Sequence, residues 1–254
     1  LIHLIKSQTV ENREEESMKS LMVCHSFWLA LGVCGVAGCV GSLLAATPAR
    51  GADAPPMIQL PEPRTQGSMP LETAIQLRRS VRNFAQTPLT LADVGQLLWS
   101  AQGITLGAGL RAAPSAGALY PLEADLVAVR VVGIEPGVYR YIPKTHTLMR
   151  RVLGDKGATL GAAALRQSCV SQAPAVVVLS AVYERTTRKY GQRGIRYVHA
   201  EAGHAAQNVC LQAVALQLGT VHIGAFHDEE VSRVLQLADD EKPLVLLPIG
   251  KPDR

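Results

Sequence analysis

Residues 196–219 read R-Y-V-H-A-E-A-G-H-A-A-Q-N-V-C-L-Q-A-V-A-L-Q-L-G. This stretch predicts one long helix, with Gly219 as the left-handed residue that ends it. Beyond Asn208 nearly every position is apolar, and a helix that is apolar all round is buried on every side. We therefore expect this helix at the centre of the fold.

A stripe of polar residues runs along the same helix. It consists of Glu201, His204, Asn208 and Gln212, whose spacings of three, four and four residues put them on one face. They can satisfy one another and nearby backbone inside the core, or they can line a pocket or a subunit boundary. Buried polar groups are usually paired in the first way, so the sequence favours that interpretation.

Composition narrows the class of protein. The 254 residues are 48% apolar and only 4% aromatic, so the core must be built from Val, Leu, Ile and Ala. The net charge of +4 is too small to indicate nucleic-acid binding, and no basic run is interleaved with aromatic residues. Outside the N-terminal apolar stretch only Cys169 and Cys210 remain, and we expect both to be buried thiols.

The N-terminal segment, residues 1–54, is predicted to be a targeting sequence. Residues 1–17 are polar, and we expect the natural start at Met18, which is followed by a basic residue and an apolar run over 21–46. An A-x-A signal ends at Ala54, and export with cleavage near that residue is the first expectation. Lipidation at Cys39 and an uncleaved membrane anchor are the alternatives. Each of them puts the rest of the chain in the periplasm or cell envelope.

Residues 55–68 are predicted to be a proline-rich linker, and residues 69–254 the folded domain. Helices and strands are mixed in the domain without strict alternation. This pattern indicates an α+β fold of three layers around one sheet. The expected helices are 68–77, 91–102, 158–167, 196–219 and 228–237, and the expected strands 122–132, 139–141, 148–153, 175–182, 221–226 and 244–249.

Three arginines close to the domain start form the first candidate site. Arg78, Arg79 and Arg82 lie within five residues, and guanidinium groups at this spacing suit bidentate binding of a phosphate. A solvated helix end is the alternative interpretation.

The loop from Pro114 to Pro121, P-S-A-G-A-L-Y-P, is the second candidate. Its small residues let backbone N–H groups approach a flat ligand closely. It has neither the G-x-G-x-x-G spacing of a dinucleotide site nor the G-K-[ST] of a P-loop. An ordinary connecting loop is the alternative.

Residues 185–196, R-T-T-R-K-Y-G-Q-R-G-I-R, are predicted to be a basic loop and form the third candidate. Lys189 and Tyr190 put an amine beside a phenol within it. If the loop folds over a pocket, either group can serve as an acid or a base. A solvated, positively charged loop is the alternative.

A metal site is not expected. His199 and His204 are five residues apart on the predicted helix and point in different directions, and Glu201 between them does not complete an H-E-x-x-H motif. The sequence also lacks a G-x-S-x-G elbow.

Six motifs in this order resemble the nitroreductase superfamily, and within it the SagB-type branch related to thiazole/oxazole-forming peptide dehydrogenases. Together they span about residues 69–252. They are R-R-S-V-R (78–82), L-L-W-S-A-Q-G-I-T (97–105), R-A-A-P-S-A-G-A-L-Y-P-L-E (111–123), Y-E-R-T-T-R-K-Y-G-Q-R-G-I-R-Y-V-H-A-E-A-G-H-A-A-Q-N (183–208), L-G-T-V-H-I-G-A-F (218–226) and P-L-V-L-L-P-I-G-K-P (243–252).

The resemblance implies a three-layer nitroreductase-like fold with a mostly antiparallel sheet, and a homodimer that binds FMN at its subunit interface. Lys189 and Tyr190 match the catalytic Lys-Tyr pair of the azoline-oxidising members. The implied contacts to the phosphate and ribityl chain are Arg78, Arg79, Ser80, Arg82 and Lys251. The implied contacts to the ring are Pro114, Ser115, Ala116, Gly117, Ala118, Leu119, Gly224 and Ala225.

The activity implied by the resemblance is hydride transfer between flavin N5 and a small or peptidic substrate. A general nitro or quinone reductase is an alternative within the same superfamily. A flavin-binding protein without turnover, or a structural module without flavin, are alternatives of other classes. No nucleic-acid partner is expected, and a membrane is expected to be contacted only through the N-terminal segment.

Overall fold

The computed structural model describes residues 56–253. The predicted signal peptide, its cleavage site at Ala54 and the lipidation alternative at Cys39 all lie outside the described residues. Between residues 56 and 253, no helix is both long enough and apolar enough to cross a bilayer.

A single large sheet organises these residues. Its seven strands lie in the order β1-β8-β7-β5-β9-β11-β10, and every neighbouring pair is antiparallel. This confirms the expected α+β class with one central antiparallel sheet. The strands are β1 (Met57–Gln59), β5 (Leu122–Ala128), β7 (Gly137–Ile142), β8 (Thr147–Leu153), β9 (Ala175–Val182), β10 (Gly219–Thr220) and β11 (Glu241–Gly250). Two small ladders pair β2 (Leu89–Thr90) with β6 (Val131–Val132) and β3 (Ile104–Leu106) with β4 (Leu110–Arg111).

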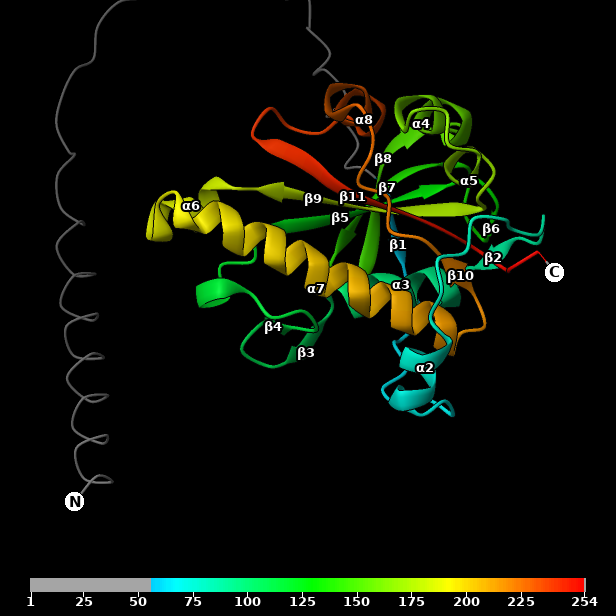
Figure 1. The fold of residues 1–254 in the computed structure, drawn as a ribbon, viewed down its shortest axis with the longest axis horizontal. Coiled ribbons are helices and arrows are strands. Elements are labelled where there is room, and N and C mark those ends of the chain that lie inside the picture. The colour runs from blue at the N-terminus through cyan, green and yellow to red at the C-terminus, as the bar shows by residue number, and fades with distance from the viewer. Residues whose placement is uncertain (1–55, 254) are drawn as a thin grey trace, which may run out of the picture. The chain divides into compact units, whose positions relative to one another are not determined.

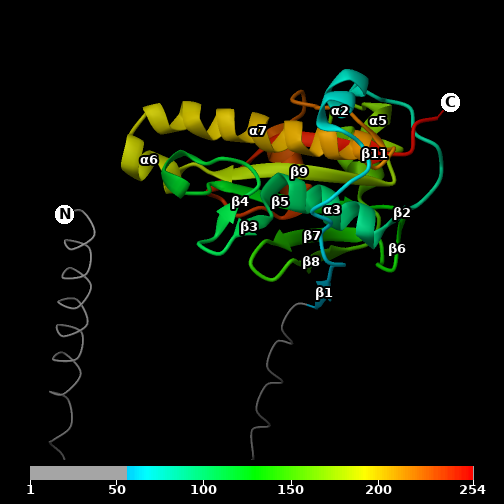
Figure 2. The same cartoon turned by 90° about the horizontal axis from the view of Figure 1, so that it is seen from below.

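Helices cover both faces of the sheet and complete three layers (Figure 1). One face packs against α3 (Leu91–Gln102) and α7 (Arg193–Ala215). The other packs against α4 (Gly157–Ala163), α5 (Ser168–Ser171) and α8 (Asp228–Leu235). The short helices α2 (Leu71–Leu77) and α6 (Glu184–Tyr190) lie beside α7, as Figure 2 shows from below, and η1 (Ala116–Ala118) is a single 3-10 turn.

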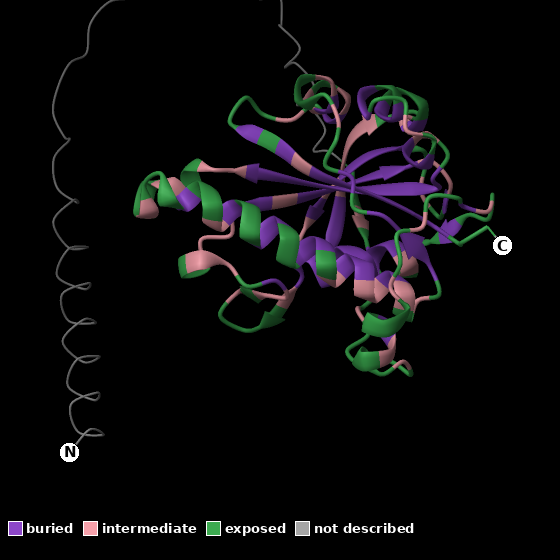
Figure 3. Ribbon diagram, in the orientation of Figure 1, coloured by how far each residue is buried: buried purple, intermediate pink, exposed green. Residues whose placement is uncertain are grey.

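Strand β9 shows why the core forms here. Its sequence A-V-V-V-L-S-A-V is apolar on both sides, and it occupies the predicted residues 175–182. Val177 and Leu179 pack toward α3 and α7, whereas Val176 and Val178 pack toward α4, α5 and α8. The strand is therefore buried on both faces (Figure 3), as an apolar run without alternation predicts.

Helix α3 begins and ends at the predicted residues. Its N-terminus is a capping box, in which Thr90 Oγ1 accepts a hydrogen bond from Asp93 N (3.1 Å) and Thr90 N donates one to Asp93 Oδ2 (2.9 Å). Helix α2 begins at Leu71 and not at residue 68 as predicted, because Pro70 is the N-cap there, and no side chain caps the helix. Helices α4 and α8 are shorter than predicted, ending at Ala163 and Leu235.

The end of the central helix differs from the prediction. Helix α7 ends at Ala215, and the left-handed residue after it is Gln217 (φ 58°), not Gly219. Gly219 lies in β10, where a Cβ atom would come within 2.6 Å of the Val81 side chain. The glycine is needed for this close approach and not for ending the helix.

Helix α7 is not buried on every side within one chain. Leu211 and Val214 are only half-buried, and Ala215 is exposed. Beside them on α2, Leu71 and Ile75 are 60% and 55% exposed. A strip of apolar residues along α7 and α2 therefore faces away from the core of the chain.

The predicted linker contributes to the domain. Met57–Gln59 forms the edge strand β1 on β8, and Leu60 is buried in the core. The backbone N–H and C=O of Arg64 are both hydrogen-bonded to the side-chain amide of Gln96, at 2.8 and 3.0 Å. The linker prediction is therefore wrong for residues 57–64, where β8 offers an open sheet edge that a short strand can join.

Two other predictions are wrong. Residues 185–190 and 193–196 are helical, in α6 and the start of α7, with a turn between them, and Thr186 is buried. Residues 221–226 do not form a strand, since only Ile223 pairs with the sheet, opposite Leu246.

Candidate functional site

The segment that carries the arginines lies against the end of the sheet. Val81 N donates to Thr220 O (3.0 Å), and Ala85 N donates to Lys251 O (2.9 Å). Ser80 pairs with Thr220 in the same way. These backbone contacts bring the predicted phosphate ligands of residues 78–82 next to Lys251, although more than 160 positions separate them in the chain.

Two glycines allow this close packing. A Cβ atom on Gly219 would clash with Val81, and one on Gly250 would lie 2.9 Å from Phe84. Both neighbours belong to the arginine segment. Small residues at the ends of β10 and β11 therefore fix the position of that segment.

The cluster of Arg78, Arg79, Arg82 and Lys251, here called the cationic cradle, has no counter-charge. Among residues 56–253, no carboxylate lies within 4.0 Å of any of these four side chains. The hydroxyl of Thr220 beside it is buried without a hydrogen-bond partner in the same part of the chain. Four cations and an orphaned hydroxyl are suited to a phosphate group.

The two cysteines show where the cradle lies. Burial raises the pKa of the Cys210 thiol on α7, and nearby Arg78 opposes that rise. Burial also raises the pKa of the Cys169 thiol on α5, and Arg82 opposes it. Both thiols are free and buried, as expected. The cradle therefore sits between the C-terminal part of α7 and α5.

The predicted ring loop and the predicted acid–base pair are in contact. A Cβ atom on Gly117 would lie 2.8 Å from Tyr190 Oη and 3.1 Å from Lys189 Nζ, so both polar atoms sit directly over this glycine. Gly117 also has a left-handed backbone (φ 64°). Only glycine satisfies both conditions without strain. Pro114, Ser115, Ala116, Gly117, Ala118 and Leu119 form one loop around η1.

The loop is strained beyond the glycine. Ala118 (φ 54°) and Tyr120 (φ 46°) also have left-handed backbones, which cost roughly 1–2 kcal/mol each for a residue with a Cβ atom. Such residues persist only where neighbours hold them. Tyr120 N donates to Ser115 Oγ (2.9 Å), Arg111 N donates to the Tyr120 hydroxyl (3.2 Å), and the Arg185 guanidinium donates to Tyr120 O (3.2 Å).

The polar stripe of α7 is mostly paired, as the sequence favours. The Asn208 amide donates to Ser100 O (3.1 Å) and Ala112 O (3.4 Å). The Gln212 amide oxygen accepts a hydrogen bond from Gln96 (3.2 Å), and His204 is exposed.

Glu201 is the exception in the stripe. It is only 2% exposed, and burial raises the pKa of its carboxyl to about 7, against the opposing effects of a hydrogen bond from Ser115 and the charge of Arg111. One of its carboxyl oxygens has no partner within the described residues. A buried acid with a raised pKa behind the ring loop is typical of a functional site.

A cavity of about 440 Å³ lies beside Gly224, between α7, the first half of β11 and the segment before α8. Ala202, Gly203 and Phe226 contribute to its walls. On its rim, Tyr183 Oη and His199 Nε2 are hydrogen-bonded at 2.7 Å. The Ala225 carbonyl accepts a bond from Gln167, and Ala225 is absent from the residues that line the cavity.

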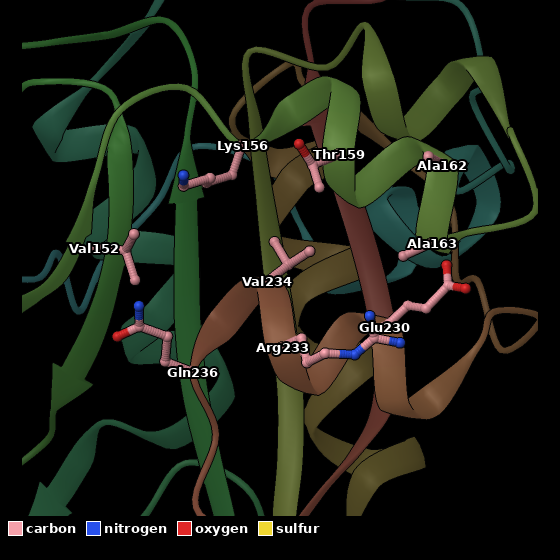
Figure 4. A pocket seen from close by; sticks show the side chains of 9 residues that line it. All are labelled: Val152, Lys156, Thr159, Ala162, Ala163, Glu230, Arg233, Val234 and Gln236. Carbon is pink, nitrogen blue, oxygen red and sulfur yellow. The ribbon is translucent and has the colours of Figure 1, made fainter.

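Another cavity, of about 340 Å³, lies between α4 and α8 on the opposite face of the sheet. Figure 4 shows Lys156 and Thr159 on one side of it and Arg233 and Gln236 on the other. None of the predicted site residues lines it, so it does not belong to the candidate site.

The predicted site residues therefore form two groups. The cationic cradle lies near Cys210, toward the C-terminal end of α7 beside α2, whereas Gly117 with Lys189 and Tyr190 lies near its N-terminal end beside α6 (Figures 1 and 2). With 23 residues rising about 1.5 Å each, α7 is roughly 35 Å long. One chain does not bring the two groups together.

Some residues of the site were missed by the sequence argument. Arg111 and Tyr120 brace the ring loop, and the Thr220 hydroxyl adjoins the cradle. Arg111 and Tyr120 belong to the same motif as the ring loop, residues 111–123. Their place in that motif is the feature of the sequence that could have identified them. No sequence pattern indicated Thr220.

Comparison with known proteins agrees with the fold and these motifs. The Methanocaldococcus jannaschii protein MJ1384, which carries a nitroreductase name, is 47% identical over 194 residues, covering 76% of this chain and 96% of its own. A Ralstonia eutropha JMP134 structure also described as a nitroreductase matches with a TM-score of 0.69 and 30% identity, over 82% of this chain and 98% of its own. The Escherichia coli microcin synthetase McbBCD, solved with truncated pro-MccB17 bound, matches in fold (TM-score 0.62, 24% identity, 70% of each chain). Residues 75–251 match the Nitroreductase family, and the chain belongs to that family.

Proposed function

We propose that this protein is an FMN-dependent oxidoreductase of SagB type, which transfers a hydride between flavin N5 and a small or peptidic substrate. The observation that carries the proposal is the contact of Tyr190 Oη and Lys189 Nζ with Gly117. Two sequence motifs, 72 residues apart, meet there as an acid–base pair over a glycine-rich loop.

The residues present fit FMN. The cationic cradle has the charge for the phosphate, and its cations are free of carboxylates in the described part of the chain, although Arg79 Nη1 donates to the backbone oxygens of Gln76 and Arg78. The cavity beside Gly224 is within the usual size range of ligand pockets, and nothing lies within 4 Å of where a Gly224 Cβ atom would be. A planar ring can therefore approach the backbone at Gly224.

The proposed active form is a homodimer. Arg78 of the cradle lies near Cys210, whereas Lys189 and Tyr190 precede the start of α7 at Arg193, roughly 25 Å away along the helix axis, a separation that the ribityl chain of FMN is too short to bridge. A second copy with its α7 antiparallel to the first puts the ring loop of one subunit beside the cradle of the other. The uncovered apolar strip of α7 and α2, with Leu71 and Ile75 exposed, suits that contact.

In this arrangement the protein supplies positioning and proton transfer. When bound, FMN supplies the acceptor and donor of hydride, which is chemistry that side chains lack. Lys189 and Tyr190 of the partner are then within reach of a substrate on the ring, where they remove a proton from it or return one. The edge of the Tyr197 ring supports Tyr190, with ring centroids 5.2 Å apart at 86°.

Titration of the purified protein with FMN tests the proposal. We expect each chain to bind one FMN, and binding is measured by the absorbance and fluorescence of the flavin. Replacing both Arg78 and Arg82 with alanine should weaken binding by about 100-fold or more, because each charge-assisted hydrogen bond contributes about 1.5–3 kcal/mol.

The control is Arg150→Ala, which removes a guanidinium that is paired with Glu135 and lies away from the cradle. It should bind FMN like the parent. A protein that stays colourless with excess FMN, or whose affinity is unchanged in the double variant, contradicts the proposed cofactor site.

A further inference from the structure

Within the described residues, Glu201 is a buried acid whose carboxyl group forms no ion pair that would explain a charged side chain at this position. No lysine or arginine lies within 4.0 Å of it among residues 56–253, so it is not half of an ion pair. One carboxyl oxygen lacks a partner, and so does the amide nitrogen of Gln102, which is also buried. A glutamine at position 201 would make the same neutral contacts without an ionisable group. Unpaired buried polar groups in a native protein call for a functional explanation.

Glu201 is joined to the ring loop through one residue. The Ser115 hydroxyl lies close enough to the Glu201 carboxyl to lower its pKa, and α7 contacts η1 beside it. The same hydroxyl oxygen accepts the N–H of Tyr120, so its own hydrogen is available for Glu201. Ser115 and Tyr120 lie at the two ends of the strained turn around Gly117 and Ala118. The charge on Glu201 therefore acts directly on the loop under Lys189 and Tyr190.

Burial and the charges around Glu201 have opposing effects on the pKa of its carboxyl, which lies at about 7. Arg111 of β4 is the cation that faces it, but the Arg111 guanidinium donates to Gln102 Oε1 (2.7 Å) and Leu122 O (3.4 Å) instead. Arg111 in turn interacts with Glu123 of β5, the Tyr120 phenol and Arg185 of α6. Burial disfavours the carboxylate, whereas Arg111 and Ser115 favour it.

We propose that Glu201 takes up one proton from solvent when a flavin ring bound over the Ser115 loop is reduced. The proposal rests on the function proposed above. Negative charge arriving on the ring is close to the loop and disfavours a second negative charge on Glu201. Glu201 thus couples proton uptake to electron uptake, and Ser115 is the link between them.

A hydride-donating substrate loses its C–H bond, is oxidised by two electrons, and delivers two electrons and one proton to the ring as a hydride. One further proton passes from a water or buffer acid, whose O–H bond breaks, to the Glu201 carboxylate, where a new O–H bond forms. Below about pH 7 Glu201 already carries its proton before reduction, so uptake occurs only above that pH.

The test is the pH dependence of the flavin midpoint potential, measured by redox titration of the FMN-loaded full chain and of Glu201→Gln. For a two-electron couple, one extra proton adds a slope of up to about 30 mV per pH unit. Above about pH 7 we expect the wild-type potential to fall more steeply than that of the variant by up to this amount. Below pH 6 the two slopes should coincide.

Glu230→Gln is the matched control, because Glu230 lies on α8 and lines the cavity of Figure 4. It should keep the wild-type slope. Equal slopes for wild type and Glu201→Gln above pH 7, with FMN bound to both, overturn the inference and leave the proposed function intact. Failure of the wild type to bind FMN overturns the proposed function itself.

A second measurement does not depend on the folding of a variant. Infrared difference spectra of the wild type with isotope-labelled glutamate compare the oxidised and reduced states at pH 8. Reduction should produce the carbonyl band of one newly protonated glutamic acid. Absence of that band also overturns the inference.

Discussion

Replacing Lys189 with methionine and Tyr190 with phenylalanine is expected to slow substrate turnover by about 10²- to 10⁴-fold, the usual contribution of a general acid or base. Both polar atoms lie over Gly117, so the double change removes every proton-transferring group at that point while keeping the side-chain volumes similar. The measurement is single-turnover reduction and reoxidation of bound FMN, with an azoline-containing peptide and with a quinone acceptor.

FMN affinity should be unchanged in this variant, because the proposed phosphate site is the cationic cradle. Arg188→Met is the control on the same helix, since within residues 56–253 its exposed guanidinium bonds only to Glu184, four residues away. It removes one positive charge and should keep the parental rate within a few-fold. A double variant that binds FMN and reacts at the parental rate with both substrates contradicts the assigned pair.

Replacing Arg140 with methionine is expected to destabilise the fold by about 3–5 kcal/mol, because it removes the cation that is hydrogen-bonded to two buried carboxylates and leaves Asp125 with the more distant Arg151, at 3.6 Å. Arg140 donates to Asp125 at 2.9 and 2.7 Å and to Glu241 at 2.6 Å. Asp125 is fully buried, and Ser180 also bonds to Glu241. The free energy of unfolding, measured in urea without FMN, should show the loss.

The loss should depend on pH in a defined direction. Burial raises the pKa of Asp125, and the charge and hydrogen bond of Arg140 oppose that rise. Without Arg140 the pKa of Asp125 rises further, so at low pH the variant buries a neutral acid and not an unpaired charge. The loss of unfolding free energy relative to wild type should therefore be smaller at pH 5 than at pH 8. Arg150→Met, which breaks a more exposed pair with Glu135, should cost about 1 kcal/mol or less. A deficit of the same size in both variants would contradict the account of this network.

Local patterns in the sequence predicted the elements whose signals are local. The apolar run of β9 and the capping box of α3 are complete within a few residues, and both elements begin and end where expected. The segment 185–196 was missed because its charges resemble a solvated loop, yet one buried residue, Thr186, fastens it as a helix. Strand β1 was missed because three residues next to prolines form a strand only when β8 offers its edge.

The site was predictable as a set of residues and not as an arrangement. Motifs identified the cationic cradle, the ring loop and the Lys189–Tyr190 pair. Their separation along α7, and the contact of the pair with Gly117, depend on tertiary packing. The ion network could not be predicted at all, because Asp125, Arg140 and Glu241 come from three strands and meet only when the sheet forms.

The central claim is that each FMN site is shared between two copies of the chain, and mixing two inactive variants tests it most directly. One variant lacks Arg78 and Arg82, and the other carries the Lys189 and Tyr190 replacements. A heterodimer then contains one site with an intact cradle and an intact partner pair, and one site with both broken.

Unfolding and refolding the two variants together at equal concentration, with FMN, gives a statistical mixture of dimers. Random pairing makes half of the dimers heterodimers with one good site of two, so the mixture should recover about a quarter of wild-type activity. If the mixture is no more active than the two variants assayed separately, each site lies within one chain and the shared-site account is wrong.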